Sequence, residues 1–428
     1  MSGRDGTEDP GAVGVPSDAG SGAHSGALGR ALAAVDRFIN PERLRAYSII
    51  LVIGYAAGIA VLLAGLRHGL DAQGKPPGAD FIIFYGVSKL TLAGQALGAY
   101  APHLLLAAER AIFPASRGVF VWTYPPPFQL VVTPLSLVPY GWALAGWTAA
   151  GLAIYLIVVK RAAGGARAAL LPALAFPGVF MNATQGQTGF LLTGLMGGGL
   201  LLIKRRPWFA GVLLGLLAVK PQFGLLLPLV CLAGGRWQTA AAGAGTALAV
   251  SAVATLAFGA PAWIGFLKAA ALSGDYLAAG ALPVEKDPSV FAALILLGAP
   301  VLWALVIHLI QAAVAVILAW PMWRRGPADM AAAAAILATL IALPYLFDYD
   351  LALLAVPIAV AARRAGAEAP IGSRTALIYL AVLPIVLAPL GKYAHTPLGP
   401  AVLWAGLLAL RSMWLGSMSL EPALAAVA

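Results

Sequence analysis

Long apolar runs, separated by short groups of charged residues, make up most of this 428-residue chain. The first run, from about residue 46 to 66, is long enough to cross a bilayer of about 30 Å as a helix. Further spans or half-spans are expected at 128–159, 168–181, 188–203, 208–219, 221–235, 238–258, 300–320, 328–343, 351–362, 374–390 and 398–416. The pattern predicts an all-α polytopic membrane protein with about 10 to 12 transmembrane or half-spanning helices.

Several of these runs contain only about 12 to 15 residues, which is too short for a clean crossing of the bilayer. Prolines border them, among others Pro177, Pro207, Pro221 and Pro344, and proline interrupts helices. We therefore expect broken or tilted helices. Because irregular backbone at membrane depth is tolerated only beside protein or a water-filled cavity, the sequence also predicts a cavity.

Composition agrees with a membrane protein, because 61% of the residues are hydrophobic, 10% are charged and the mean hydropathy is +0.88. The formal net charge is +10, but the basic residues form short groups between apolar runs. Such groups report topology, so the partner they indicate is the lipid bilayer and not nucleic acid. The single cysteine, Cys231, lies in an apolar run, and a disulfide framework, a cysteine-based zinc site or an iron–sulfur cluster is unsupported.

The chain divides into four predicted regions. Residues 1–29 are rich in Gly, Ser, Ala and Asp and lack the early basic and apolar sections of a signal peptide, which indicates a disordered cytoplasmic tail. Residues 30–45 form an interfacial segment with a short surface helix. Residues 46–416 form the transmembrane domain, in which 67–127 is the first outer loop, and residues 417–428 form a C-terminal tail.

Basic residues set the orientation of the domain. With a cytoplasmic N-terminus, about 17 of the 27 Lys and Arg residues fall on the inner side and about nine on the outer side. The inner connections hold Lys160, Arg161, Arg167, Lys204, Arg205, Arg206, Arg236, Arg324, Arg325, Arg363, Arg364, Arg374 and Arg411. This predicts a multi-pass protein of the plasma (inner) membrane with both termini in the cytoplasm.

Polar residues that can support chemistry collect in the predicted outer connections. Asp80 lies in the first outer loop, within Gly78-Ala79-Asp80-Phe81-Ile82-Ile83-Phe84-Tyr85, and the others lie in 182–187, 220–222, 344–350 and 391–395. Ionisable residues at a membrane are costly and are commonly functional. We therefore expect the site in a cavity on the outer, periplasmic face.

Two ordered sets of residues resemble glycosyltransferase family 87, which includes mycobacterial polyprenol-phosphate-mannose-dependent mannosyltransferases of the GT-C class. The first set is Asp80-Phe81, Tyr85, Gly94, Tyr100, Thr123-Tyr124-Pro125-Pro126-Pro127 and Pro134-Leu135-Ser136-Leu137-Val138-Pro139. The second is Gly186-Gln187, Trp208-Phe209-Ala210-Gly211, Gly215 and Lys220-Pro221. The resemblance covers about residues 46 to 365 and implies a GT-C-like fold.

The resemblance implies an inverting hexosyl or pentosyl transferase whose donor is a polyprenyl-phosphate sugar and whose acceptor is a glycolipid or glycan hydroxyl, without a metal or other cofactor. Its general base is an Asp in the first outer loop, which Asp80 matches. A carboxylate can take the proton of a hydroxyl nucleophile, and polyprenyl phosphate leaves without a second carboxylate. The alternatives are that Asp80 only caps a helix, or that Asp71, in what reads as a solvated turn, is the base.

Other outer residues are candidates for substrate binding. Lys220, at a helix break before Pro221, is expected to meet the donor phosphate, or else to extend to the lipid headgroups. Gln187 is expected to bind phosphate or sugar, or to belong to a polar turn. Tyr124, before three prolines, is read as part of a cavity wall, with sugar or prenyl stacking as the alternative, and Trp122 as an interfacial aromatic residue.

The chain departs from the mycobacterial pattern after Pro344, where the mannosyltransferases carry a histidine pair and this chain has Asp348 and Asp350. These acids are candidates to bind sugar hydroxyls, or a divalent cation through the donor phosphate, although no metal is predicted. His395 is a candidate to compensate for the missing histidines, although a surface turn also explains it. No soluble domain for a nucleotide sugar fits within the loops. A transporter or flippase of lipid-linked sugars, or a glycan ligase, is the competing function.

Overall fold

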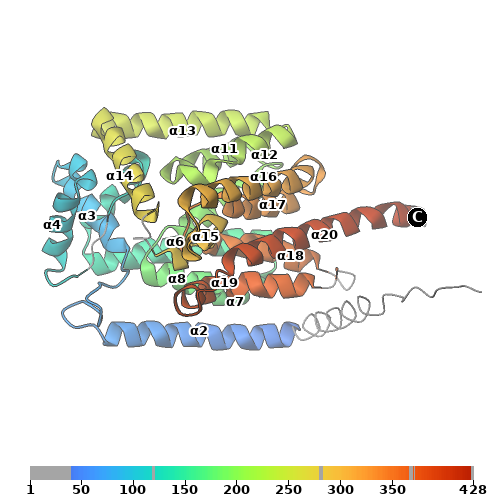
Figure 1. Cartoon of the computed structure of the whole chain (residues 1–428), viewed down its shortest axis with the longest axis horizontal. Coiled ribbons are helices and arrows are strands. Elements are labelled where there is room, and N and C mark those ends of the chain that lie inside the picture. Colours follow the sequence, from blue (N-terminus) through green and yellow to red (C-terminus); the bar gives the residue numbers. More distant parts are fainter. Residues whose placement is uncertain (1–39, 118–120, 279–282, 366–369, 371, 426–428) are drawn as a thin grey trace, which may run out of the picture.

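The computed structural model describes residues 40–117, 121–278, 283–365, 370 and 372–425, which form helices and turns without a β-strand (Figure 1). Six of these helices are long and apolar enough to cross a membrane. They are α2 (Pro41–Ala64), α6 (Tyr140–Ala162), α13 (Trp237–Phe258), α16 (Val301–Arg325), α19 (Ser373–Ala394) and α20 (Gly399–Ala425). The all-α polytopic fold is thereby confirmed.

Shorter helices and single turns connect the long ones. The α-helices are α3 (Phe81–Leu92), α4 (Pro102–Ile112), α5 (Pro126–Val132), α7 (Leu170–Ala175), α8 (Pro177–Gln185), α9 (Gly189–Leu192), α10 (Gly198–Leu202), α11 (Pro207–Gly215), α12 (Leu227–Gly234), α14 (Ala260–Ala278), α15 (Val290–Leu296), α17 (Ala328–Ala342) and α18 (Ala355–Arg364). The 3₁₀ turns are η1 (Ala96–Tyr100), η2 (Thr133–Leu137), η3 (Arg167–Ala169), η5 (Leu216–Val219), η6 (Pro221–Gly224), η7 (Val284–Lys286) and η8 (Asp348–Leu354), and η4 (Thr193–Gly197) is a π-helical turn.

The predicted helix breaks are present. α7 ends before Phe176 and α8 starts at Pro177, while Lys220, with a non-helical φ of −148° and ψ of 71°, separates η5 from η6 before Pro221. Proline has no N–H to continue the preceding helix and disfavours a helical conformation in the residue before it. The short apolar runs are therefore halves of broken helices.

Several predicted boundaries are wrong. The run 128–159 is not one span, because α5 and η2 end before Pro139 and α6 starts at Tyr140. The segment 67–127, which we expected to be the first outer loop, contains α3 and α4. α20 continues to Ala425, past the predicted start of a C-terminal tail at residue 417. Apolar helices that pack on protein or lie obliquely escape a search for full membrane spans.

The predicted tail, residues 1–29, and most of the interfacial segment lie outside the described residues. From Pro41 onward the chain is already α2, so residues 41–45 belong to the membrane helix and not to a separate surface helix. Asn40 caps this helix by accepting a hydrogen bond of 2.8 Å from the backbone N–H of Arg43. A polar cap followed by proline in the first turn is a favoured helix start.

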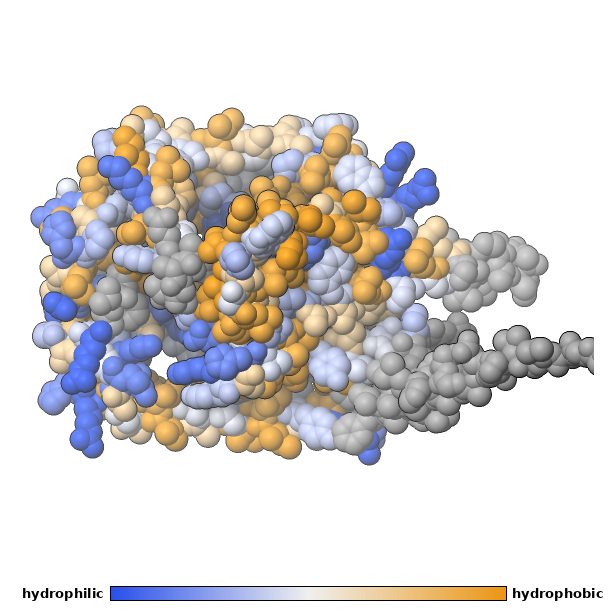
Figure 2. Space-filling model, in the orientation of Figure 1, coloured by the Kyte–Doolittle hydropathy of each residue, from blue (hydrophilic) through white to orange (hydrophobic). Residues whose placement is uncertain are grey.

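The long helices expose apolar side chains on their outer faces. Ile50 and Val61 of α2 are 64% and 72% exposed, and Leu256 of α13 is 87% exposed. Apolar residues also cover much of the face shown in Figure 2. Such a surface matches hydrocarbon and not water, which agrees with a protein that spans the bilayer.

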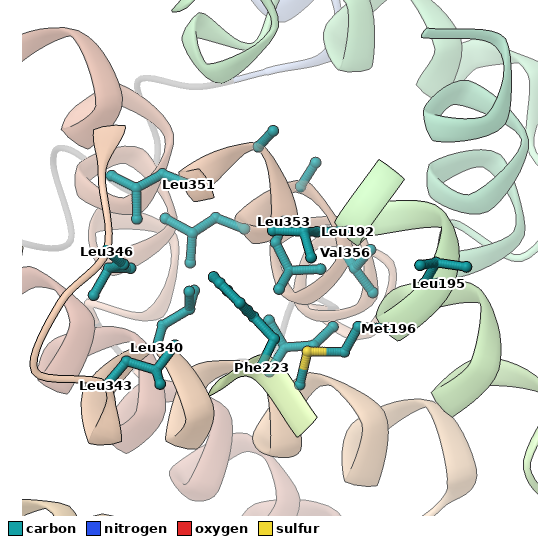
Figure 3. Packing of buried hydrophobic residues seen from close by; sticks show 14 of the residues in the cluster. Leu192, Leu195, Met196, Phe223, Leu340, Leu343, Leu346, Leu351, Leu353 and Val356 are labelled. Atoms are coloured by element: carbon teal, nitrogen blue, oxygen red, sulfur yellow. The ribbon is translucent and has the colours of Figure 1, made fainter. Parts of the chain in front are cut away.

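Figure 3 shows part of a buried apolar cluster, which includes residues close in sequence to the polar residues of the outer connections. Leu192 of α9, Phe223 of η6 and Leu351 of η8 have no exposed surface. They pack with residues of α17, which is buried along nearly its whole length. Because Phe223 and Leu351 stand close in sequence to Lys220 and Asp350, their packing fixes the backbone that carries those charges.

The connections that the charge pattern assigned to one side also meet one another. Among the inner set, Lys204 Nζ donates to Gly326 O at 3.4 Å and Arg364 Nε to Asp329 at 2.8 Å. The outer set is joined by a hydrogen bond of 3.1 Å from Asp80 N to Gln185 O. α3 and α4 lie at one end of the bundle, and α20 extends from the other (Figure 1). Which end faces the cytoplasm stays a prediction from the charges.

Candidate active site

Asp80 lies at the start of α3, against the turn between α8 and α9. Its backbone N–H donates to Gln185 O at 3.1 Å. Gly186 ends α8 with φ of +65°, and a Cβ at this position would lie 2.7 Å from Phe81 Cβ. A side chain at position 186 would be unfavourable because of the positive φ and because of this short contact. Glycine at 186 therefore lets the turn approach Asp80 closely.

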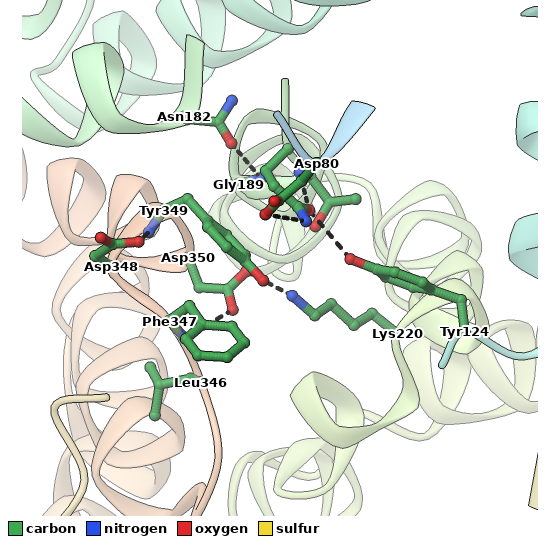
Figure 4. A network of polar contacts seen from close by, with 12 residues as sticks. Asp80, Tyr124, Asn182, Gly189, Lys220, Leu346, Phe347, Asp348, Tyr349 and Asp350 are labelled. Atoms are coloured by element: carbon green, nitrogen blue, oxygen red, sulfur yellow. Dashed lines mark hydrogen bonds and ion pairs between the residues drawn. The ribbon is translucent and has the colours of Figure 1, made fainter. Parts of the chain in front are cut away.

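The Asp80 carboxylate is directed to Gln187 and not to its own helix. Although Asp80 stands at the N-cap of α3, its side chain makes no capping hydrogen bond. Instead, Gln187 Nε2 donates to Asp80 Oδ2 at 3.0 Å (Figure 4). Oδ1 accepts no hydrogen bond from the described residues. Helix capping thus does not account for this acid, and one carboxylate oxygen is left for another group.

Gln187 is itself held in one orientation. Its Oε1 accepts hydrogen bonds of 3.1 Å from the Tyr124 hydroxyl and from the backbone N–H of Thr188. With two donors at the carbonyl end, the amide must turn its NH₂ group toward Asp80. In this position Gln187, a predicted substrate ligand, is an orienting partner of the carboxylate.

Tyr124 belongs to a buried aromatic cluster. Its ring centroid lies 5.6 Å from Phe84 and 4.6 Å from Phe128, and its carbonyl oxygen accepts a hydrogen bond of 2.9 Å from the Tyr100 hydroxyl. These contacts agree with a role in the wall of the site. The interfacial role expected for Trp122 is wrong, because its side chain is 2% exposed and stacks on Phe128.

Lys220 forms a buried ion pair with Asp350. The distance from Lys220 Nζ to Asp350 Oδ1 is 2.6 Å, and the two side chains are 9% and 1% exposed (Figure 4). Asp350 Oδ2 accepts from the backbone N–H of Phe347 at 3.2 Å. The ammonium also lies 5.2 Å and 5.3 Å from the ring centroids of Phe223 and Tyr349. The lysine therefore does not extend to lipid headgroups, and an acid of its own chain balances its charge.

Asp348 lies apart from Asp350 (Figure 4). Its Oδ1 accepts hydrogen bonds from the backbone of Tyr349 at 2.8 Å and from Gln185 Nε2 at 3.2 Å, whereas Oδ2 is buried without a partner. The two acids do not form a carboxylate pair. Among the described residues no group of three His, Cys, Asp or Glu is arranged to hold a metal ion.

His395 and Asp71 lie in exposed turns. His395 is exposed after the end of α19, with φ of +47°, and makes no hydrogen bond to the site residues in the part of the chain that is described. Asp71 Oδ1 accepts hydrogen bonds from the backbone N–H groups of Gln73 and Lys75 at 2.9 Å and 2.8 Å. Asp71 therefore stabilises a turn, as its glycine- and proline-rich neighbours indicated.

Two polar neighbours of the candidate site were not singled out from the sequence. Gln185 holds Asp348, and Asn182 Oδ1 accepts a hydrogen bond of 2.7 Å from the backbone N–H of Gly189. A Cβ on Gly189 would lie 2.2 Å from Tyr349 O, so α9 and η8 are in backbone contact here. The signal was present, because both residues stand in the same polar run, 182–187, as Gln187.

Burial raises the pKa of Asp80, and the hydrogen bond from Gln187 and the charges of Lys286, Lys75 and Lys220 oppose this rise. Burial also raises the pKa of Asp348. A carboxyl group with a raised pKa is a better proton acceptor near neutral pH. The environment of Asp80 thus suits a general base.

A cavity of about 120 Å³ lies beside this arrangement. It is lined by residues of η1, α14 and the segment before α5, including Tyr100, Trp122, Lys268, Leu272 and Tyr276. This places a cavity in the predicted outer connections. Asp80 does not line it, so the cavity adjoins the aromatic wall instead of containing the candidate base.

Gln187→Leu should lower kcat/KM by about 10- to 100-fold, because the carboxylate loses the group that orients it. Removing this donor also removes an interaction that lowers the pKa of Asp80. A base must be ionised to act, so the acidic limb of the kcat/KM profile should move to higher pH. Steady-state kinetics across pH test this, with Gln95→Leu, at an exposed glutamine, as the control. An unmoved acidic limb would contradict the orienting role.

The comparison with protein families identifies the chain. The sequence model of glycosyltransferase family 87 matches residues 122–347, which is more than half of the chain. Neither the curated proteins nor the solved structures include a match. The matched region holds Tyr124, Gln187 and Lys220, and Asp80 lies before it. The chain therefore belongs to glycosyltransferase family 87.

Proposed function

We propose that this membrane glycosyltransferase moves a sugar from a polyprenyl-phosphate donor to a hydroxyl of a glycolipid or glycan, with inversion and with Asp80 as general base. The observation that carries the proposal is the carboxylate of Asp80, which does not cap α3 and is oriented by Gln187 at 3.0 Å. Family membership supplies the reaction class. The local geometry supports Asp80 as the base.

The proposed step is a single displacement at the anomeric carbon. Asp80 takes the acceptor proton while the acceptor oxygen bonds to the sugar and the bond to the phosphate oxygen breaks. The leaving group is a phosphate ester, which needs little help from an acid. One carboxylate is therefore sufficient, and the separation of Asp348 from Asp350 is compatible with this chemistry.

The proposed location is the outer face of the inner membrane, with both termini in the cytoplasm. Support comes from the charge pattern and from the two groups of connections that meet at opposite ends of the bundle. A lipid-linked donor suits this side, where nucleotide sugars are generally absent. The bilayer is then the medium that delivers the donor.

A transfer assay tests the donor class. Purified full-length protein in proteoliposomes would be given a panel of radiolabelled polyprenyl-phosphate hexoses and pentoses together with lipid and glycan acceptors. We expect a labelled glycosidic product from at least one donor, and no product from the matching nucleotide sugar. Movement of the labelled lipid across the bilayer without a new bond would support a transporter or flippase instead.

A further inference from the structure

The site has fewer cations than a phosphate donor requires. Three carboxylates, those of Asp80, Asp348 and Asp350, are brought together around η8 and the α8–α9 turn. In the described part of the chain Lys220 is the cation in direct contact with this group, and Asp350 already neutralises it at 2.6 Å. A phosphodiester adds a further negative charge, and anions in a partly buried site need a cation nearby.

Lys286 is placed to be that cation. It ends η7, is partly exposed, and forms no ion pair in the described part of the chain. Burial raises the pKa of both Asp80 and Asp348, and the Lys286 ammonium opposes this rise at both carboxyl groups. The charge of Lys286 thus favours the ionised form of both carboxyl groups.

The backbone around Lys286 is fixed to the loop that carries Asp348 and Asp350. Asp287 is buried, and its Oδ2 accepts from the backbone N–H of Leu346 at 3.4 Å. Ser289 Oγ donates to Pro344 O at 3.1 Å, and the Ser289 N–H donates to Asp287 Oδ1 at 2.8 Å. Two of these contacts join Asp287 and Ser289 to the loop 344–350, and the third orients the Asp287 carboxylate.

Helix α19 also packs against η7. A Cβ on Gly391 of α19 would lie 2.8 Å from Glu285 Cβ and 3.0 Å from Glu285 Cα. α19 therefore packs closely against the residue before Lys286. The Lys286 side chain is partly exposed, and its flexible four-carbon stem suits a cation that meets a substrate anion.

We propose that Lys286 binds the phosphate of the polyprenyl-phosphate donor, the role that the sequence had indicated for Lys220. The inference rests on the proposed function. During transfer the bond from the anomeric carbon to the phosphate oxygen breaks, its electron pair stays on that oxygen, and the acceptor proton goes to Asp80. The phosphate changes from a monoanion to a dianion, so a cation at this point stabilises the products and the transition state more than the bound donor.

Binding of decaprenyl phosphate, compared with neutral decaprenol, tests the inference without turnover. Full-length protein in phosphatidylcholine nanodiscs would be titrated with each lipid. We expect Lys286→Gln to weaken binding of decaprenyl phosphate about tenfold or more and to leave decaprenol binding unchanged, because only the phosphate bears a charge. Lys286→Arg should stay within about threefold of wild type, since the charge is kept.

Lys392→Gln is the matched control, because Lys392 is an exposed lysine in the last turn of α19 and is not among the charges named as acting on Asp80. The control should bind both lipids as wild type does. Equal binding of decaprenyl phosphate by wild type and Lys286→Gln, or equal weakening of both lipids, would overturn the role of Lys286 while leaving the proposed function intact. If wild type does not distinguish the phosphate from the alcohol, the proposed donor class fails, and this inference fails with it.

Discussion

Asp80→Asn should lower kcat by about 10²- to 10⁴-fold, the range associated with loss of a general base. Asparagine has nearly the same shape and its side-chain oxygen can still accept a hydrogen bond from Gln187 Nε2, which now donates to Asp80 Oδ2 at 3.0 Å. The substitution removes the basic carboxylate without opening a gap in the site. The measurement is single-turnover transfer from the active donor, together with the affinity for that donor, which should change little.

Asp71→Asn is the control for this experiment. Asp71 is the other acid of the same outer segment, and its carboxylate accepts hydrogen bonds from two backbone N–H groups within a turn. Asparagine can preserve these bonds, so turnover should stay near the wild-type value. Near-normal turnover in Asp80→Asn, or a collapse of turnover in Asp71→Asn alone, would show that the base is assigned to the wrong residue.

Breaking the Lys220–Asp350 pair from either side should destabilise the protein by about 3–5 kcal/mol. Both side chains are nearly fully buried, so Lys220→Met leaves an unpaired carboxylate and Asp350→Leu leaves an unpaired ammonium. The double variant Lys220→Met/Asp350→Leu removes both charges and should recover most of the lost stability. Equilibrium unfolding of the three variants in mixed micelles gives the free energies and the coupling between the two sites.

The exposed pair between Arg364 and Asp329 offers the comparison for this cycle. Its side chains are 33% and 15% exposed, and Arg363 also contacts Asp329. Arg364→Gln should therefore cost no more than about 1 kcal/mol. Additive losses in the Lys220/Asp350 double variant would mean that the two charges do not depend on each other in the folded protein.

Much of the fold could be predicted from the apolar runs, because a bilayer demands helices whose length and hydropathy can be read locally. The prolines also located true breaks, as at Pro177 and Pro221. The prediction failed where a helix is short and buried in protein. α3 is buried along most of its length. It has only 12 residues and follows a proline- and glycine-rich turn, so in the sequence it was read as part of a loop.

The sequence predicted which residues belong to the candidate site, but not which of them contact one another. Asp80, Gln187 and Tyr124 form one hydrogen-bonded chain, and Lys220 and Asp350 lie beside it. Their side chains were expected on one face because their connections alternate across the membrane. Contacts between residues as far apart as Lys220 and Asp350 depend on how the half-helices pack, which has no local signature.

By itself the sequence determined that the chain is a multi-span helical membrane protein whose polar residues gather in one set of connections, and its ordered motifs indicated the family. These are properties of composition, periodicity and residue order. Only the tertiary structure decided that Gln187 donates to Asp80, that Lys220 is neutralised by Asp350, and that Asp287 is bonded to the loop 344–350. The reason is that hydrogen bonds and ion pairs act over a few ångströms, and only packing sets such distances between remote residues.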